Sequence, residues 1–162
     1  MSGTLITAVT ATSAVCAGVA GGVYFAFSAI VMPALRALPA DHCIAAMRRI
    51  NTSAVRLPFM AVFFGGAAAS VALVVTELVS DASAPGTANR MAGAGLALAA
   101  FGITIVRNVP LNNELARNVP DGVDAAARWT AFDRGWSSAN HARAVASLAA
   151  VVVFLDSLAR SG

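Results

Sequence analysis

The sequence has few charged residues and no lysine. Charged side chains make up 12% of its 162 residues, whereas about a quarter of the residues in an ordinary soluble domain are charged. All eleven basic residues are arginines, and the eight acidic residues leave a net charge of +3, so we expect no nucleic-acid partner. A hydrophobic fraction of 58% and a mean hydropathy of +0.74 exclude a soluble globular domain and indicate a small integral membrane protein.

Cysteine and histidine are also scarce, with two of each. Cys16 lies within an apolar segment and Cys43 in a polar one, so we expect no disulfide between them. A metal site would need His42, Cys43 and His141 to converge from distant segments, because no pair has the i, i+4 spacing of ligands on one helix. We therefore expect neither a metal nor a haem. The apolar segments contain no chain of carboxylates, which argues against a channel or pump.

Four segments are expected to cross the membrane as helices. Residues 5–31 form an apolar run longer than the roughly 20 residues that a bilayer requires, and 57–79 form a second one. We place the third span at 89–109 and the fourth at 135–158. The fold class expected is all-α: the whole chain is one integral membrane four-helix bundle. Short interfacial helices are expected in loop one, between the first two spans, and in loop three, between the last two.

The fourth span has little apolar length of its own. Only twelve uncharged residues separate Arg143 from Asp156. They cover about 18 Å of a hydrocarbon layer roughly 30 Å thick. To cross, the helix has to begin near residue 135 and bring Asn140, His141 and Arg143 into or near the membrane.

The arginines are unevenly distributed between the two sides of the membrane. Loops one and three with their flanks contain nine of them, whereas the opposite side has only Arg90 and Arg160. Because short cytoplasmic loops have the excess of positive charge, we place loops one and three in the cytoplasm and both termini outside. We expect the plasma (inner) membrane. No positive residue precedes the first apolar run, so a cleaved signal peptide is not expected.

Small residues in the spans favour close packing of the helices, because they let helix backbones approach one another in lipid. The glycines expected to do this are Gly18, Gly22, Gly65, Gly66, Gly93, Gly95 and Gly102. The partners expected are the bilayer and a hydrophobic small molecule, and the composition is compatible with a homo-oligomer.

Polar and aromatic residues are expected to converge where four helix ends meet, at the side of loops one and three. The candidate site residues are Tyr24, Asn51, Asn108, Asn112, Trp129, Phe132, Trp136, Asn140, His141 and Arg143. At about 100° per residue, those from Trp129 to Arg143 share one helix face, except His141, which flanks it. Polar groups inside a membrane cost free energy and usually mark a site, so we interpret this cluster as a functional cavity.

Structural explanations exist for the same residues. Trp129 and Trp136 also fit an interfacial aromatic belt, and Arg143 could extend to a lipid phosphate from one turn inside the membrane. Pro110 cannot continue the helical hydrogen-bond ladder, so we expect the helix to break there. The neighbouring asparagines then either cap the helix end or line the cavity.

Four segments resemble the anthrone-oxygenase-like family of small four-span membrane proteins. They are residues 27–35, 46–51, 108–113 and the pattern W-x-x-F-x-x-x-W-x-x-x-N-H-x-R over 129–143. Fungal members oxidise an anthrone to an anthraquinone with molecular oxygen, without a metal or flavin. The resemblance implies an oxidoreductase that uses oxygen as co-substrate and no cofactor. It implies site roles for Asn108, Asn112, Trp136, Asn140, His141 and Arg143.

Anthrone chemistry assigns roles to these residues. The ring methylene of an anthrone is acidic, and its anion reacts with oxygen directly. His141 is the candidate base, since histidine titrates near neutral pH. Arg143, with Asn140 and Asn112, would hold the developing oxyanion. Flat surfaces for the substrate would come from Trp129, Phe132 and Trp136.

Two functional hypotheses follow. The first is a membrane oxidoreductase that carries out oxygen-dependent oxidation of a hydrophobic aromatic, polyketide-like or quinone-like compound. The alternative is a non-catalytic membrane subunit or small-ligand-binding protein, in which the polar cluster fixes helix packing or contacts a partner.

Overall fold

The computed structural model describes residues 3–79, 85–117 and 124–161, and every element within those ranges is a helix. In chain order the elements are α1 (Gly3–Ala26), the π-helix η1 (Phe27–Val31), α2 (Met32–Arg36), α3 (Ala40–Ala54), α4 (Leu57–Val79), α5 (Thr87–Ile103), the π-helix η2 (Thr104–Asn108), α6 (Val109–Arg117) and α7 (Ala125–Ser161). α1, η1 and α2 follow one another without a break, as do α5, η2 and α6.

Four helical stretches are long and apolar enough to cross a membrane: Gly3–Arg36, Leu57–Val79, Thr87–Arg117 and Ala125–Arg160. The expected all-α fold is confirmed, and the chain is a multi-pass membrane protein. Three of the stretches are longer than the spans expected from the apolar runs. The 37 residues of α7 extend about 55 Å, more than a hydrocarbon layer of roughly 30 Å, so part of α7 lies beyond that layer.

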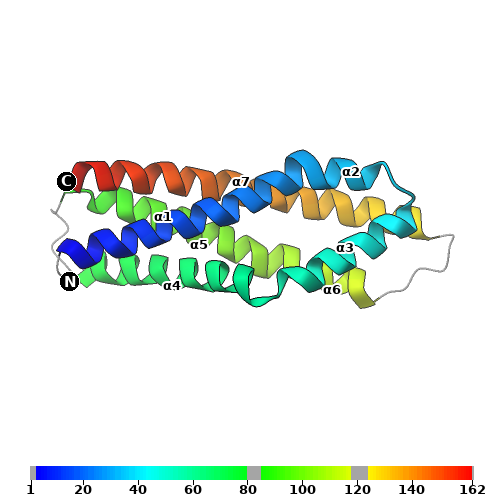
Figure 1. Cartoon of the computed structure of the whole chain (residues 1–162), viewed down its shortest axis with the longest axis horizontal. Coiled ribbons are helices and arrows are strands. Elements are labelled where there is room, and N and C mark those ends of the chain that lie inside the picture. The colour runs from blue at the N-terminus through cyan, green and yellow to red at the C-terminus, as the bar shows by residue number, and fades with distance from the viewer. Residues whose placement is uncertain (1–2, 80–84, 118–123, 162) are drawn as a thin grey trace.

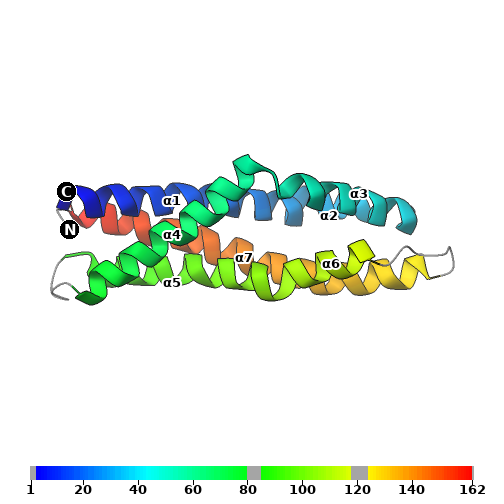
Figure 2. The ribbon, with the colours of Figure 1, turned by 90° about the horizontal axis from the view of Figure 1, so that it is seen from below.

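The helices run the length of an elongated bundle, with both termini at one end (Figure 1). α2, α3, α6 and the start of α7 lie at the opposite end, called here the loop end. α7 packs against both α1 and α5, and α4 packs against the same two helices. Figure 2 shows that α4 crosses the bundle obliquely, from α5 towards α1. At the loop end, α3 packs against both α6 and α7.

Both π-helices precede a proline. η1 ends two residues before Pro33, and η2 ends two residues before Pro110. A proline cannot donate a backbone hydrogen bond, and its ring clashes with the carbonyl four residues earlier. In both segments the residue after the π-helix donates its N–H to the carbonyl five residues before it, which widens the turn. The helix therefore continues through Pro110 as α6, and the expected break there is wrong.

Close helix packing occurs at some of the glycines. A Cβ at Gly66 would lie 2.7 Å from the Cβ of Cys16, and one at Gly93 would lie 2.7 Å from the ring of Phe154. Gly18 meets Val151 at an ordinary contact distance of 3.6 Å. The packing expectation is wrong for the glycines that would meet nothing within 4 Å, which are Gly22, Gly65, Gly95 and Gly102.

The loop end has its own hydrophobic core. Its buried residues are Met32, Leu35, Cys43, Ile44, Met47, Leu115, Ala125, Trp129, Phe132 and Trp136. Polar contacts fasten the elements around it: Arg36 Nε lies 2.7 Å from Asp133 Oδ2, which ties α2 to α7. Arg48 donates to the carbonyl of Ala116, which ties α3 to α6. This core fixes the positions of the helices at the loop end.

A buried ion pair lies near the terminal end of the bundle, between α4 and α5. Arg90 and Glu77 are each about 5% exposed, and Arg90 Nε donates to Glu77 Oε1. Arg90 also donates to the carbonyl of Pro85 at 3.0 Å, and Thr87 Oγ1 donates to Glu77 Oε2 at 2.8 Å. Arg90 is one of the two arginines on the side of the membrane opposite loops one and three. It also has a structural role, as the partner of Glu77.

Cys43 fixes the turn between α2 and α3, and its reactivity is predicted to be low. Its Sγ donates to the carbonyl of Leu35 at 2.9 Å, and the residue is 1% exposed. Burial raises the pKa of the Cys43 thiol above its usual value. Less thiolate is present at a given pH, so iodoacetamide should modify Cys43 slowly in a Cys16→Ala variant, with a pH midpoint above that of an ordinary thiol. The same variant unfolded in dodecyl sulfate is the control; equal rates in the two states would contradict the prediction.

Candidate functional site

A cavity of about 560 Å³ lies where the start of α4 meets the elements of the loop end. This volume is typical of small-molecule sites. Five parts of the chain line it: the end of α1 with η1, the second half of α3, the start of α4, η2 with α6, and α7. Its lining residues are Val23, Tyr24, Phe27, Arg49, Ile50, Asn51, Ser53, Ala54, Val55, Phe59, Met60, Thr104, Asn108, Val109, Asn112, Trp136 and Arg143.

Arg143 is a buried cation in the wall of this cavity. Its side chain belongs to α7, and the residue is 5% exposed. The guanidinium carbon lies 4.2 Å from the ring centre of Tyr24 and 5.4 Å from that of Trp136, so both rings contact the cation through their faces. Nη1 donates to Thr104 Oγ1 at 3.3 Å.

No carboxylate among the described residues pairs with Arg143. The ion pairs found there are Arg36 with Asp133, His42 with Asp41, Arg90 with Glu77, and Arg160 with Asp156. An arginine keeps its charge in a protein, and a buried charge is costly without a counter-charge. The wall of the cavity therefore presents an uncompensated positive charge.

Asn140 holds Arg143 in place through a hydrogen bond, from a position outside the cavity lining. Its Nδ2 donates to the backbone carbonyl of Tyr24 and to Ser28 Oγ, both at 2.8 Å, and its Oδ1 accepts from Arg143 Nη2 at 2.8 Å. Asn140 is fully buried and does not line the cavity. Ser28 belongs to η1, so the first π-helix contributes to holding the arginine in place.

The cavity-lining residues include several buried polar atoms without a hydrogen-bond partner in the described structure. They are Asn51 Nδ2, Asn108 Oδ1, Asn112 Oδ1, Trp136 Nε1 and Arg143 Nε. Buried polar groups are usually paired, so such a concentration in one place needs an explanation. Three of these atoms are donors and two are acceptors. A polar, hydrogen-bonding ligand in the cavity would satisfy both kinds.

The rest of the cavity wall is apolar and partly aromatic. Phe27 lies against Trp136, with ring centres 5.2 Å apart, and Phe59 belongs to the first turn of α4. Val55, at the joint between α3 and α4, is 67% exposed. The cavity wall therefore combines an apolar surface with a few polar atoms and one cation, as is common in small-molecule sites.

The sequence model of the anthrone oxygenase family matches residues 59–153, which is more than half of the chain. The chain belongs to the anthrone oxygenase family. Comparisons with curated proteins and with solved structures give no significant match. The matched region contributes Thr104, Asn108, Asn112, Trp136 and Arg143 to the cavity, whereas Tyr24 and Asn51 come from outside it.

Six of the residues expected at the site line the cavity of this anthrone oxygenase family member. They are Tyr24, Asn51, Asn108, Asn112, Trp136 and Arg143. The expected helix face of α7 is also buried: this holds for Trp129, Phe132, Trp136, Asn140 and Arg143. Two members of that face lie away from the cavity: Trp129 and Phe132 pack in the core of the loop end. They lie about two turns and one turn before Trp136 on α7, where the side chains of α2, α3 and α6 surround them.

His141, the expected base, is not in the cavity. It is exposed on the outside of α7 and is absent from the cavity lining. The reason is geometric: one residue turns a helix by about 100°, so the neighbour of fully buried Asn140 has to point away from it. His42, Cys43 and His141 do not gather either, because no cluster of three potential metal ligands occurs within the described ranges.

Several cavity residues were not predicted. Thr104 is one helical turn before Asn108, and Phe27 is one turn after Tyr24, so helical spacing from the predicted residues would have found both. Phe59 and Arg49 had no such signal, because their position depends on how α3 and α4 join.

Proposed function

We propose that this protein oxidises a flat, hydrophobic aromatic ketone of the anthrone type with molecular oxygen in the cavity beside Arg143. The observation that supports this most directly is a permanently charged, buried arginine without an acidic partner among the described residues, in the wall of a largely apolar cavity. Membership of the anthrone oxygenase family supports an oxygenase-like activity.

Arg143 would act by stabilising the substrate as an anion. Loss of a ring-methylene proton from an anthrone makes its central ring aromatic and places negative charge on the oxygen. A guanidinium fixed in a site of low dielectric stabilises that oxyanion more strongly than water does. Asn51 Nδ2 and Trp136 Nε1, which have no partner in the described structure, are further donors for oxygen substituents.

The reaction needs no oxidant beyond oxygen. The substrate carbanion forms a carbon–oxygen bond with dioxygen, and protonation gives a hydroperoxide. Loss of the second methylene proton then breaks the O–O bond and leaves a ketone and one water. One anthrone and one dioxygen thus give one anthraquinone and one water, so we propose that the protein works without a bound cofactor. A strong visible absorption band of the purified protein, from haem or flavin, would contradict this.

No imidazole or carboxylate lines the cavity among the described residues. We therefore propose that Arg143 lowers the pKa of the substrate itself and that water at the cavity mouth accepts the proton. Arg49 lies on the wall with an exposed side chain, so this part of the cavity is near the surface. In this mechanism His141 takes no part in proton transfer.

His141→Ala is expected to change turnover by less than about threefold, because His141 is exposed and outside the cavity. A general base usually contributes about 10²- to 10⁴-fold to a rate. The measurement is oxygen consumption with anthrone by the variant and the parent protein in detergent micelles. If turnover falls a hundredfold or more in a folded His141→Ala protein, His141 is the base and the mechanism proposed here is wrong.

Ligand binding without turnover is the outcome that would favour a non-catalytic role. If the purified protein binds anthrone in an Arg143-dependent manner but consumes no oxygen, the cavity belongs to a small-ligand-binding protein or membrane subunit. If anthrone neither binds nor is oxidised, this substrate class is wrong.

We also propose that the loop end faces the cytoplasm, as the distribution of arginines indicates. Ala37 and Ala88 are exposed and lie at opposite ends of the bundle, at the α2–α3 turn and the start of α5. In a cysteine-free background, an impermeant maleimide added to intact cells should label an Ala88→Cys variant and not an Ala37→Cys variant. The reverse labelling would invert the orientation.

A further inference from the structure

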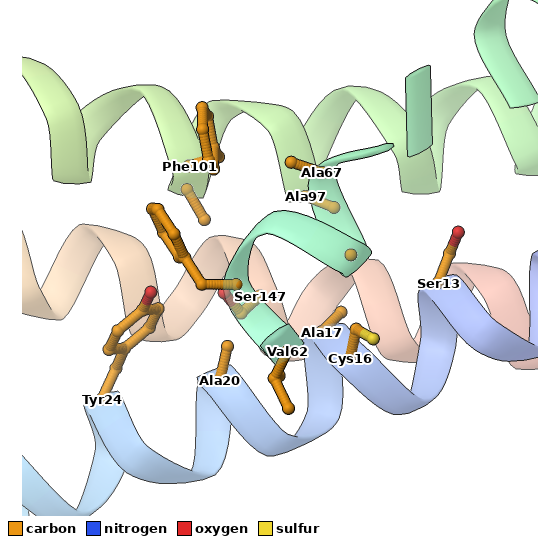
Figure 3. Close-up of a pocket in the computed structure, with 13 residues that line it drawn as sticks. Ser13, Cys16, Ala17, Ala20, Tyr24, Val62, Ala67, Ala97, Phe101 and Ser147 are labelled. Carbon is orange, nitrogen blue, oxygen red and sulfur yellow. The ribbon is translucent and has the colours of Figure 1, made fainter. Parts of the chain in front are cut away.

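Another, much smaller cavity lies between α1, α4, α5 and α7 (Figure 3). Its volume is about 30 Å³. All of its lining residues belong to the four membrane-spanning stretches. Most are small or aromatic: alanines at 17, 20, 67, 97 and 100, with Gly66, Val62, Phe63 and Phe101. Phe63 and Phe101 stack on each other with ring centres 4.6 Å apart.

The size and lining of this cavity fit a small apolar molecule. A cavity needs a volume of roughly 10–15 Å³ to hold one water molecule. The small cavity, with about 30 Å³, therefore admits a molecule of two heavy atoms and excludes an aromatic ring. Apolar cavities in proteins stay dry and bind apolar guests such as xenon. Ser13 is the residue in the lining with a buried hydroxyl that lacks a partner in the described structure.

Tyr24 connects the small cavity to the large one. It lines both cavities, and its ring lies 4.2 Å from the guanidinium carbon of Arg143. Figure 3 shows Tyr24 at one end of the small cavity and Ser13 at the other. A molecule that moves past the Tyr24 ring therefore passes from the small cavity into the large one and arrives beside the proposed substrate anion.

We infer that the small cavity is a dioxygen site that supplies the reaction at Arg143. Dioxygen has two heavy atoms and is apolar, so it dissolves better in the hydrocarbon layer than in water. The spanning helices that line the cavity contact that layer. This inference rests on the proposed oxidation, since only an oxygen-consuming reaction gives the cavity a purpose. In this arrangement the two substrates reach Arg143 by different routes. Oxygen arrives from the bilayer through the small cavity, and the aromatic substrate enters the large cavity at the loop end.

Filling the cavity should impair the use of oxygen and leave substrate binding unchanged. Ala67→Val and Ala97→Val each add two methyl groups to the lining, from α4 and α5 respectively. Matched controls are Ala68→Val and Ala99→Val, whose side chains are exposed on the same helices. We expect the two cavity variants to lower the second-order rate constant for oxygen several-fold, with the KM for anthrone unchanged. The controls should match the parent protein.

Xenon binding tests the cavity independently of turnover. Xenon-pressurised crystals of the parent protein should show xenon between Ala67 and Ala97, and crystals of the Ala67→Val variant should not. If xenon binds but the protein does not oxidise anthrone, the gas site is supported and the proposed oxidation is wrong. Normal turnover with no xenon, with oxygen kinetics unchanged in both cavity variants, would overturn the gas site alone. A water bound to Ser13 Oγ in the cavity would also overturn it.

Discussion

Replacing Arg143 with methionine is expected to lower the turnover of anthrone by about 10²- to 10³-fold, the usual loss when one oxyanion-stabilising group is removed. Methionine has a similar length and no charge, so the cavity keeps its shape while the counter-charge for the substrate anion disappears. Turnover is measured as oxygen consumption at saturating anthrone, together with formation of anthraquinone. Exposed Arg107, on η2 and outside the cavity lining, gives the matched control Arg107→Met, which should leave turnover unchanged.

The same substitution should not weaken the fold. Removing a buried cation without an acidic partner removes a desolvation penalty of several kcal/mol. This gain offsets the lost contacts with the rings of Tyr24 and Trp136 and the lost hydrogen bond that Arg143 donates to Asn140 Oδ1. The free energy of unfolding should therefore fall by no more than about 1 kcal/mol. An Arg143→Met protein that is folded and still oxidises anthrone at the parent rate would remove Arg143 from the mechanism.

The identical substitution at the other buried arginine should do the opposite. Arg90→Met leaves Glu77 buried and without its partner, and breaking a buried ion pair in this way usually costs about 3–5 kcal/mol. We expect a loss of this size in the free energy of unfolding, measured by denaturant titration in mixed micelles. Turnover per folded molecule should remain normal, because this pair is near the terminal end and the cavity is at the loop end.

Two controls identify the cause of the Arg90→Met effect. Arg160→Met breaks an exposed ion pair with Asp156, which water already screens, so it should change the free energy of unfolding far less than Arg90→Met does. The double variant Glu77→Gln with Arg90→Met removes the buried charge that the single variant leaves unpaired, and should recover part of the lost stability. If the double variant is as unstable as Arg90→Met alone, the unpaired Glu77 charge is not the cause.

Hydropathy and helical spacing were sufficient to predict much of this molecule. The apolar runs predicted four spanning helices, since a bilayer requires a minimum length of apolar chain. Spacing of about 100° per residue predicted that Trp136, Asn140 and Arg143 share the buried face of α7, and it also set His141 beside that face.

Other features depend on packing that no local pattern records. Trp129 and Phe132 share the face of Trp136, but they pack in the core of the loop end against α2, α3 and α6, which the spacing along α7 does not predict. The helix continues through Pro110 because the π turn before it widens the helix, an outcome that proline alone does not predict. The Glu77–Arg90 pair could not be predicted from the sequence, because it depends on how α4 and α5 pack against each other.

The ionisation of bound anthrone is the most direct test of the role proposed for Arg143. Under nitrogen, the absorption band of the anthrone anion is followed as a function of pH, with anthrone free, bound to the parent protein and bound to Arg143→Met. We expect the pKa of anthrone bound to the parent protein to lie about one unit or more below that of free anthrone, which corresponds to roughly 1.4 kcal/mol of preferential stabilisation of the anion. Arg143→Met should abolish this lowering. A bound anthrone whose pKa equals or exceeds that of the free compound in the parent protein would show that the cavity does not stabilise the anion.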